Sequence, residues 1–131
     1  YPPPIDFSLG KTNDIEVTLS SGSEVSTPTS ILVVPRNGFS SSVSLSVVSS
    51  DLPPDPSPTY NFSSTLLGCT IDTNGDGVID QCETSIFSVT VPGSTPPRMY
   101  SITIQGEGGG FTRTIDVFLN IKELRPEFRE I

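Results

Sequence analysis

The feature that most constrains this chain is an alternation of apolar and polar residues that recurs along most of its 131 residues. In residues 15–19, for example, Ile15, Val17 and Leu19 alternate with Glu16 and Thr18. A period of two puts the apolar side chains on one face of a β-strand and the polar ones on the other. The same pattern occupies residues 43–47, 87–91, 100–104 and 111–121, and shorter apolar stretches lie at 6–9 and 60–63. We therefore expect half-buried antiparallel strands in these segments.

One segment, residues 31–34, is apolar at every position. A continuous run of this kind indicates a strand that is covered on both sides or lies at a sheet corner. Turn-forming pairs such as Asn37-Gly38 and Pro92-Gly93 separate the segments from one another. Seven or eight short strands between such turns predict a sandwich of two antiparallel sheets, with a barrel as the other arrangement that fits.

The composition excludes several other classes of protein. The chain has no Ala and 13 Pro, which argues against a helical bundle, and no His, which removes His-based triads and His-ligated zinc sites. A net charge of −8 with only 7 Lys and Arg argues against binding to nucleic acid or to an anionic membrane surface. No apolar run approaches the ~20 residues of a membrane-spanning helix, so we expect no membrane insertion.

The two ends of the sequence differ from its middle. Residues 1–5 begin Tyr-Pro-Pro-Pro, and residues 123–131 change abruptly to charged residues around Pro126. Such segments are typical of linkers, so we expect a domain from a longer protein, with a linker at 1–5 and a charged tail or linker at 123–131. The sandwich is then expected to span residues 6–122, with an insertion at 66–84.

Tyr100 stands at the start of the predicted strand 100–104, just after Pro96-Pro97. This placement is similar to the tyrosine corner of immunoglobulin-like sandwiches, in which the hydroxyl binds a loop carbonyl. An ordinary core tyrosine is the other reading. Neither gives Tyr100 a catalytic role.

A series of short motifs extends this similarity over roughly residues 7–121. In order, the motifs are Asn37-Gly38-Phe39-Ser40, residues 43–47, Leu52-Pro53, Asn61-Phe62-Ser63, residues 87–92, Pro96-Pro97, residues 99–104 and residues 108–114. Together they resemble the immunoglobulin-like (fibronectin III-like) accessory modules of secreted bacterial and archaeal proteins. The resemblance implies a non-catalytic spacer or adhesive unit, placed beside catalytic domains or along a cell-surface protein. The chain departs from that family at residues 66–83.

The departure contains the one constellation of residues with metal chemistry. Residues 72–83 match the twelve-residue calcium loop D-x-[DN]-x-[DN]-G-x5-E at every defined position. The expected ligands of Ca²⁺ are Asp72, Asn74, Asp76, the backbone carbonyl of Val78, Asp80 and Glu83, because Ca²⁺ takes six to eight oxygen ligands. Gly77 permits the sharp turn, and Ile79 is expected to pack against the body of the domain.

Residues 72–83 have other interpretations besides a lone calcium loop. Asn-Gly and Asp-Gly are also strong turn dipeptides, so an acidic hairpin loop is the alternative to a calcium site. The flanking residues do not form amphipathic helices, which argues against a paired EF-hand. A lone loop, similar to dockerin or thrombospondin type 3 calcium segments, is the better comparison. Magnesium fits less well, because it prefers few carboxylates and retains several waters.

Cys69 and Cys82, the only two cysteines, bracket this loop. A calcium loop brings its ends together, so we expect a disulfide between them and an oxidising, extracellular or cell-surface location. Two buried free thiols, or half of a metal site, are the alternatives. Asn61-Phe62-Ser63 is in addition an N-glycosylation sequon, with Asn61 as the candidate residue.

Function follows from these features as an expectation. No acid is grouped with a nucleophile, so we expect no enzymatic activity. We expect a calcium-stabilised structural spacer, adhesion or interaction module, whose partners are neighbouring domains of the same chain and a surface protein or polysaccharide. The alternative is a carbohydrate-binding accessory module of a secreted hydrolase. Trp is absent, which leaves aromatic candidates for sugar contact at Tyr1, Phe39, Tyr60 and Phe111.

Overall fold

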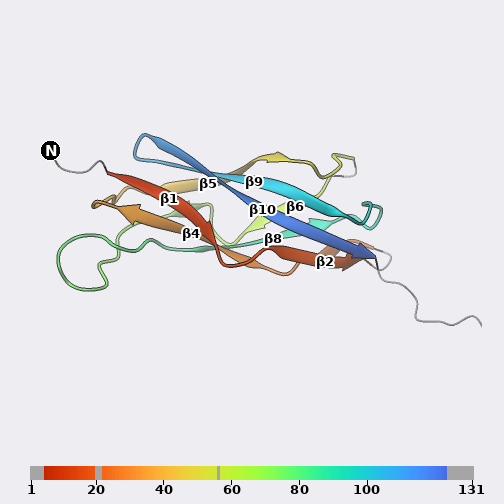
Figure 1. Ribbon diagram of the computed structural model, residues 1–131, viewed down its shortest axis with the longest axis horizontal. Helices are drawn as coiled ribbons and strands as arrows, with labels where there is room; N and C mark the ends of the chain where they lie inside the picture. Colours follow the sequence, from red (N-terminus) through yellow and green to blue (C-terminus); the bar gives the residue numbers. More distant parts are fainter. Residues whose placement is uncertain (1–4, 20–21, 56, 124–131) are drawn as a thin grey trace, which may run out of the picture.

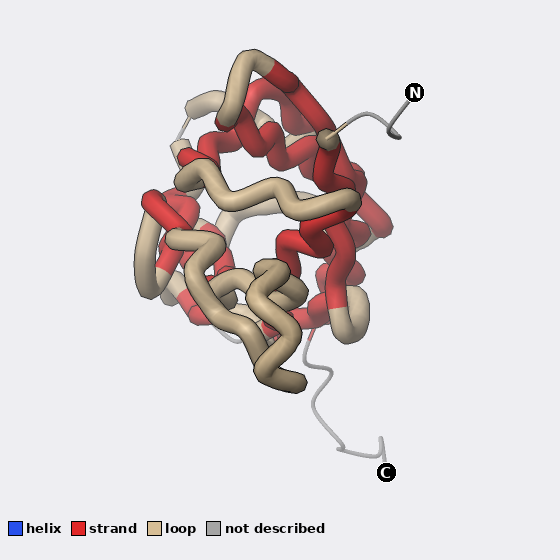
Figure 2. Tube along the Cα trace, turned by 90° about the vertical axis from the view of Figure 1, so that its left-hand side faces the viewer, coloured by secondary structure: helices blue, strands red, loops and turns tan. Residues whose placement is uncertain are grey.

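The computed structural model describes residues 5–19, 22–55 and 57–123, in which every regular element is a β-strand. The strands form two sheets that pack face to face, seen from the side in Figure 1 and from one end in Figure 2. This arrangement confirms the expected all-β sandwich and excludes a single closed barrel. Of the predicted linker 1–5 and the predicted tail 123–131, residues 1–4 and 124–131 lie outside the described part of the chain, and Glu123 belongs to the last strand.

Each sheet has five strands within the described residues. The first contains β1 (Asp6–Lys11), β4 (Thr29–Arg36), β8 (Ser85–Val91) and β3 (Glu24–Val25) in that order, with β6 (Thr59–Phe62) also paired to β8. The second contains β2 (Ile15–Leu19), β10 (Phe111–Glu123), β9 (Met99–Gly108), β5 (Val43–Ser50) and β7 (Leu66–Leu67). The prediction of seven or eight strands missed β3 and β7, which have two residues each.

The alternation seen in the sequence corresponds to burial in the structure. In β2, for example, Ile15, Val17 and Leu19 are buried while Glu16 and Thr18 are exposed. The continuous run at residues 31–34 behaves in the same way, because Ile31 and Val33 face the core and Val34 is 43% exposed. Of the two interpretations given for this run, coverage on both sides was therefore wrong. On its outward side Leu32 is half-buried and Val34 exposed, beside residues 80–84 of the loop that precedes β8.

The first strands of the chain are divided between the two sheets. β1 pairs antiparallel with β4, whereas β2 pairs parallel with β10, with Ile15 opposite Leu119. The expectation of purely antiparallel sheets was thus wrong at this one pairing of the described strands. Thr29 stabilises the segment that connects β1 to β2. Its buried hydroxyl donates to the Asn13 carbonyl at 2.7 Å and accepts from the Asn13 N–H at 3.2 Å.

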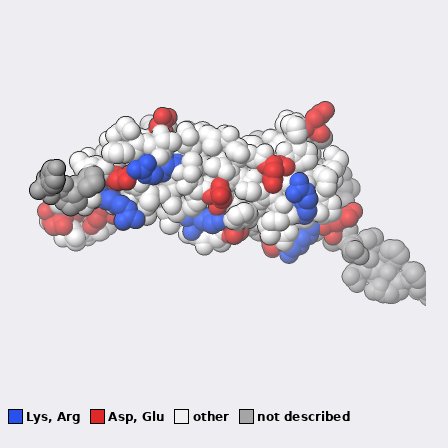
Figure 3. Space-filling view, turned by 45° about the horizontal axis from the view of Figure 1, so that its top comes forward, with Lys and Arg blue, Asp and Glu red and all other residues white. Residues whose placement is uncertain are grey.

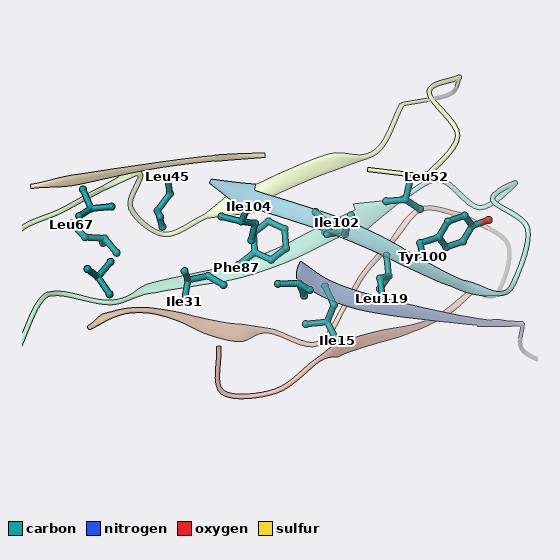
Figure 4. Packing of buried hydrophobic residues seen from close by; sticks show 14 of the residues in the cluster. Ile15, Ile31, Leu45, Leu52, Leu67, Phe87, Tyr100, Ile102, Ile104 and Leu119 are labelled. Carbon is teal, nitrogen blue, oxygen red and sulfur yellow. The ribbon is translucent and has the colours of Figure 1, made fainter. Parts of the chain in front are cut away.

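The core lies between the sheets and receives side chains from both. Figure 4 shows Phe87 of the first sheet beside Ile102 and Ile104 of the second, and all three are fully buried. Burial of each such side chain contributes about 1.5–3 kcal/mol relative to exposure. An ion pair between Arg113 and Asp6, at 2.7 Å, joins β10 to β1 at the edge of this core.

Tyr100 makes the loop contact that one of the two interpretations of this residue, a tyrosine corner, requires. Its ring is buried and its hydroxyl donates to the Pro96 carbonyl at 2.7 Å. In Figure 4 this oxygen points away from the core toward the end of the sandwich. The Arg98 guanidinium lies over the same ring, 4.2 Å from its centroid. The hydroxyl therefore connects the start of β9 to the loop that precedes it, and the role of Tyr100 is structural.

Candidate functional site

The segment with the calcium-loop motif connects β7 to β8. Since Leu66 and Leu67 already belong to β7 and Ser85 to β8, the irregular part of the predicted insertion is residues 68–84. It projects at the left of Figure 1, where the chain is drawn in green, and at this end loops face the viewer in Figure 2. Residues 73–78 make only bends and are exposed, whereas Asp72 is half-buried.

The base of this loop is closed by a disulfide between Cys69 and Cys82, as predicted. Both cysteines are buried in the hydrophobic core cluster, and no free cysteine occurs in the described residues. Ile71 and Gln81 form an isolated antiparallel bridge just inside the disulfide. Ile79 packs against the core cluster, which confirms its predicted role as the apolar anchor of the loop.

The first half of the loop is organised around the carboxylate of Asp72. The N–H of Gly77 donates to Asp72 Oδ2 at 2.8 Å, and the N–H of Gly75 donates to Oδ1 at 2.9 Å. Both glycines have positive φ, +77° at Gly75 and +83° at Gly77, a backbone conformation that side chains with a Cβ resist. These hydrogen bonds, that from Gly77 first, hold the pKa of Asp72 below its ordinary value because they stabilise the ionised form.

The other predicted ligands make separate local hydrogen bonds. Asn74 Oδ1 accepts from the N–H of Asp76, and Asp76 Oδ1 accepts from the N–H of Val78. Asp80 accepts from the N–H and the hydroxyl of Thr73, at 2.9 and 2.8 Å. Each of these hydrogen bonds is local, so the side chains of Asn74, Asp76 and Asp80 do not share a common centre.

Glu83, the last predicted ligand, lies at the base of the loop rather than over its centre. Its Oε1 accepts from the N–H of Gly68 at 2.8 Å. Within residues 5–19, 22–55 and 57–123, no three Asp, Glu, Cys or His side chains converge into a group that could hold a metal ion. The structure therefore places all the predicted ligands in one loop but does not bring their side chains together.

Asn61, the glycosylation candidate, is in the middle of β6. Its side-chain amide donates to Thr90 Oγ1 of β8 at 3.1 Å and is half-buried. The amide nitrogen that a glycan would modify is thus engaged in a contact between two strands.

The aromatic residues considered for sugar contact are mostly not available. Phe39 is buried against Phe7, with ring centroids 4.9 Å apart, so its expected exposure in a loop was wrong. Tyr60 is half-buried and stacks on Phe87, and Phe111 is half-buried at the start of β10. Tyr1 lies outside the described residues.

Sequence reasoning missed Phe118, which is 39% exposed on the outer face of β10. A signal was present: Phe118 has the outward parity of residues 111–121, where its neighbours on the same face, Asp116 and Asn120, are polar. An aromatic residue on the polar face of a half-buried strand is not needed for the core.

The charged residues do not form a patch of one sign on the face seen in Figure 3, where acidic and basic side chains are interspersed. Lys122 pairs with Glu16 at 3.1 Å, for example, and Lys11 pairs with Asp14. In the described part of the chain, no helix has the length and apolar character needed to cross a membrane.

Comparison with solved structures supports the fold. A family 123 glycoside hydrolase from Clostridium perfringens, studied for glycolipid glycan hydrolysis, is similar to 92% of this chain with a TM-score of 0.53 and 11% identity. This chain spans 27% of the hydrolase's length. The CooA pilin subunit from enterotoxigenic Escherichia coli is similar over 91% of this chain and 99% of its own, with a TM-score of 0.45 and 15% identity.

No family model and no curated protein matches the sequence. At 11% identity the similarity to the hydrolase shows a shared fold and nothing about activity, and the similarity to the pilin is too low to carry an argument. The strand arrangement and the first comparison together define an all-β, two-sheet sandwich domain.

Proposed function

We propose that this chain is a non-catalytic, calcium-stabilised immunoglobulin-like module of a secreted or cell-surface protein, which acts as a spacer and adhesion unit between neighbouring domains. The observation that carries the proposal is the course of the chain through the sandwich. β1 begins at one end of the long axis and β10 finishes at the other, at the left and right of Figure 1. A domain whose chain enters at one end and leaves at the other holds its neighbouring domains apart by about its own length.

Two features support the immunoglobulin-like class. The first strands are split, so that β1 pairs with β4 in one sheet and β2 pairs parallel with β10 in the other. The hydrogen bond from Tyr100 to the Pro96 carbonyl has the geometry of a tyrosine corner. In immunoglobulin-like sandwiches a tyrosine at the start of the penultimate strand makes this contact with backbone a few residues upstream.

The chemistry of loop 72–83 supports calcium. Asp72, Asn74, Asp76, Asp80, Glu83 and the Val78 carbonyl would hold the ion, and all of them offer the hard oxygen atoms that Ca²⁺ prefers. A carboxylate has about four lone-pair sites, so the hydrogen bonds now made by Asp72 and Asp80 leave acceptor capacity. A bound Ca²⁺ would supply positive charge to a loop with four carboxylates and no Lys or Arg.

The disulfide and the composition support the remaining parts of the proposal. Disulfides persist in oxidising compartments, so the Cys69–Cys82 bond favours a secreted or surface location. The absence of His from the whole sequence removes the most common general base, which favours a non-catalytic role.

A tandem fusion tests the spacer role. Two copies of residues 1–131 joined head to tail would be measured by small-angle X-ray scattering in calcium. We expect a maximum dimension close to twice that of the single copy, because the ends of the sandwich lie apart along its axis. A compact dimer of the two copies, with a maximum dimension near that of one, would contradict the proposal.

A further inference from the structure

The outer face of the second sheet carries a hollow that the calcium loop does not explain. Its volume is about 430 Å³, and the residues that matter for its chemistry are Asn13, Asp14, Glu16, Met99, Phe118 and Asn120. Pockets of about 300–1,000 Å³ are the usual size of small-molecule sites. The strand register explains why these residues meet: Glu16 of β2 and Met99 of β9 are both paired to Asn120 of β10.

The apolar part of the hollow is formed by Phe118 and Met99. Met99 is 54% exposed, and Phe118 is the only aromatic among the large apolar side chains exposed in the described residues. The position of Phe118 is fixed by contacts with Lys11 and Asp14. Lys11 Nζ lies 5.0 Å from the ring centroid, and the Phe118 N–H donates to Asp14 Oδ1 at 3.1 Å.

The polar part of the hollow consists of amide and carboxylate groups. The half-buried Asn120 side chain makes no hydrogen bond to any described residue, which leaves both its carbonyl and its NH₂ for a ligand. Glu16 contributes a carboxylate that is also paired with Lys122 at 3.1 Å. Asp14 contributes a second carboxylate, whose Oδ1 is held by Lys11 and by the Phe118 N–H.

This combination defines the chemical class of the ligand. Carboxylates accept hydrogen bonds from hydroxyl groups. Both carboxylates are paired with lysines and no described Lys or Arg lines the hollow, so it offers no free positive charge to a phosphate, sulfate or uronate group. An aromatic ring beside a thioether offers an apolar surface to the C–H face of a sugar ring. We propose that the hollow binds a neutral saccharide unit, with Phe118 and Met99 against its ring and Asn120 and Glu16 on its hydroxyls.

The saccharide site deepens the adhesion role in the proposed function, but it does not depend on the calcium loop. β2 lies at the right of Figure 1 and the loop at residues 72–83 lies at the left. Removal of calcium from folded protein should therefore leave saccharide binding intact. The two proposals can in this way fail separately.

A glycan array probed with the intact chain, followed by titration calorimetry with the best neutral oligosaccharide, tests the site. The arms of the array separate neutral plant and microbial polysaccharide fragments from neutral glycoprotein glycans. We expect binding to neutral members and a loss of at least tenfold in affinity in Phe118→Ala and in Asn120→Ala. Phe118→Tyr should retain binding, since the ring face is kept. Val48→Ala, a truncation of an exposed side chain of β5 outside the hollow, is the matched control.

Several outcomes would overturn the assignment. They are binding to sulfated or uronate glycans in preference to neutral ones, no binding to any neutral glycan, unchanged affinity in Phe118→Ala, or loss of binding in EDTA while the fold persists. Chemical-shift mapping on the unaltered chain provides a readout that needs no variant. Shifts should centre on Asn13, Glu16 and Asn120, and shifts centred elsewhere would refute the site.

Discussion

Glu83 and Gly68 are joined by two hydrogen bonds at the base of the loop. The Glu83 N–H donates to the Gly68 carbonyl at 2.9 Å, and the Gly68 N–H donates to Glu83 Oε1 at 2.8 Å. This reciprocal contact lies beside the Cys69–Cys82 disulfide and fixes where the loop ends. The Glu83 carboxylate, which we propose as the bidentate calcium ligand, is therefore also the hydrogen-bond acceptor of the Gly68 N–H.

Glu83→Gln distinguishes the role of Glu83 as a hydrogen-bond acceptor from its proposed role as a calcium ligand. The amide oxygen of Gln can still accept from the Gly68 N–H, so the stability in EDTA should change little. The loss of a bidentate carboxylate should weaken calcium binding by about tenfold or more. Titration calorimetry measures the affinity, and Glu107→Gln on the exposed face of β9 is the control. An unchanged affinity would remove Glu83 from the ligand set.

The disulfide should stabilise the fold independently of the ion. Closing a loop of ~14 residues constrains the unfolded chain by roughly 3 kcal/mol. Cys69→Ala with Cys82→Ala should lower the free energy of unfolding in EDTA by about that amount, measured in urea. The unaltered chain, reduced while unfolded and refolded with a reductant, should behave like the double variant. Equal midpoints for the oxidised and reduced chains would be inconsistent with a structural disulfide.

The tyrosine corner gives a prediction about a single oxygen atom. Tyr100→Phe removes the donor to the Pro96 carbonyl and keeps the buried ring, so we expect a loss of about 1–3 kcal/mol in stability. Tyr60→Phe is the matched control, because the Tyr60 hydroxyl has no hydrogen bond to a described residue. Equal effects of the two substitutions in chemical denaturation would show that the corner is not important for stability.

Acid should destabilise the sandwich through Asp6 and Asp14, in addition to Asp72 of the loop. The hydrogen bond from Arg113 lowers the pKa of Asp6, and that from Lys11 lowers the pKa of Asp14, below the ordinary value of 3.8. The folded state thus favours the ionised forms, and their contribution is present above the ordinary pKa and lost as pH falls through the folded-state values. The free energy of unfolding should decline below about pH 4.

The slope of that decline identifies the groups responsible. Asp6→Asn should flatten the acid limb of a plot of stability against pH, whereas Asp55→Asn, at an exposed loop position, should leave it unchanged. A stability that does not vary between pH 5 and pH 2 would show that neither Asp6 nor Asp14 is stabilised by folding.

The strands themselves were largely predictable from sequence. The period of two at residues 15–19 matches β2 residue for residue, because alternate burial is the physical condition for a strand with one face in the core. The two-residue strands β3 and β7 were not predictable, since two residues are too short to show a period. The pairing of strands was not predictable either. The local pattern of residues 15–19 does not predict that Ile15 pairs parallel with Leu119, which is distant in sequence.

The site was predictable to a smaller extent. The loop boundaries and the disulfide follow from the spacing of Cys69, Cys82 and the acidic residues, which are local in sequence. The hollow around Phe118 and Asn120 was not found, because it is assembled from three strands and from residues more than 80 positions apart, such as Glu16 and Asn120. The one sequence signal for the hollow is an aromatic residue, Phe118, at an outward position of a half-buried strand.

Thermal unfolding of the intact chain in millimolar calcium and in EDTA tests the central claim most directly. An ion bound only by the folded state adds about 2.7 kcal/mol at a concentration 100 times its Kd, which for a domain of this size raises Tm by roughly 5 °C or more. We predict such a shift with calcium, a smaller one with magnesium, and none with calcium in a variant carrying Asp72→Asn, Asp76→Asn and Glu83→Gln. An identical Tm in calcium and in EDTA would contradict the account.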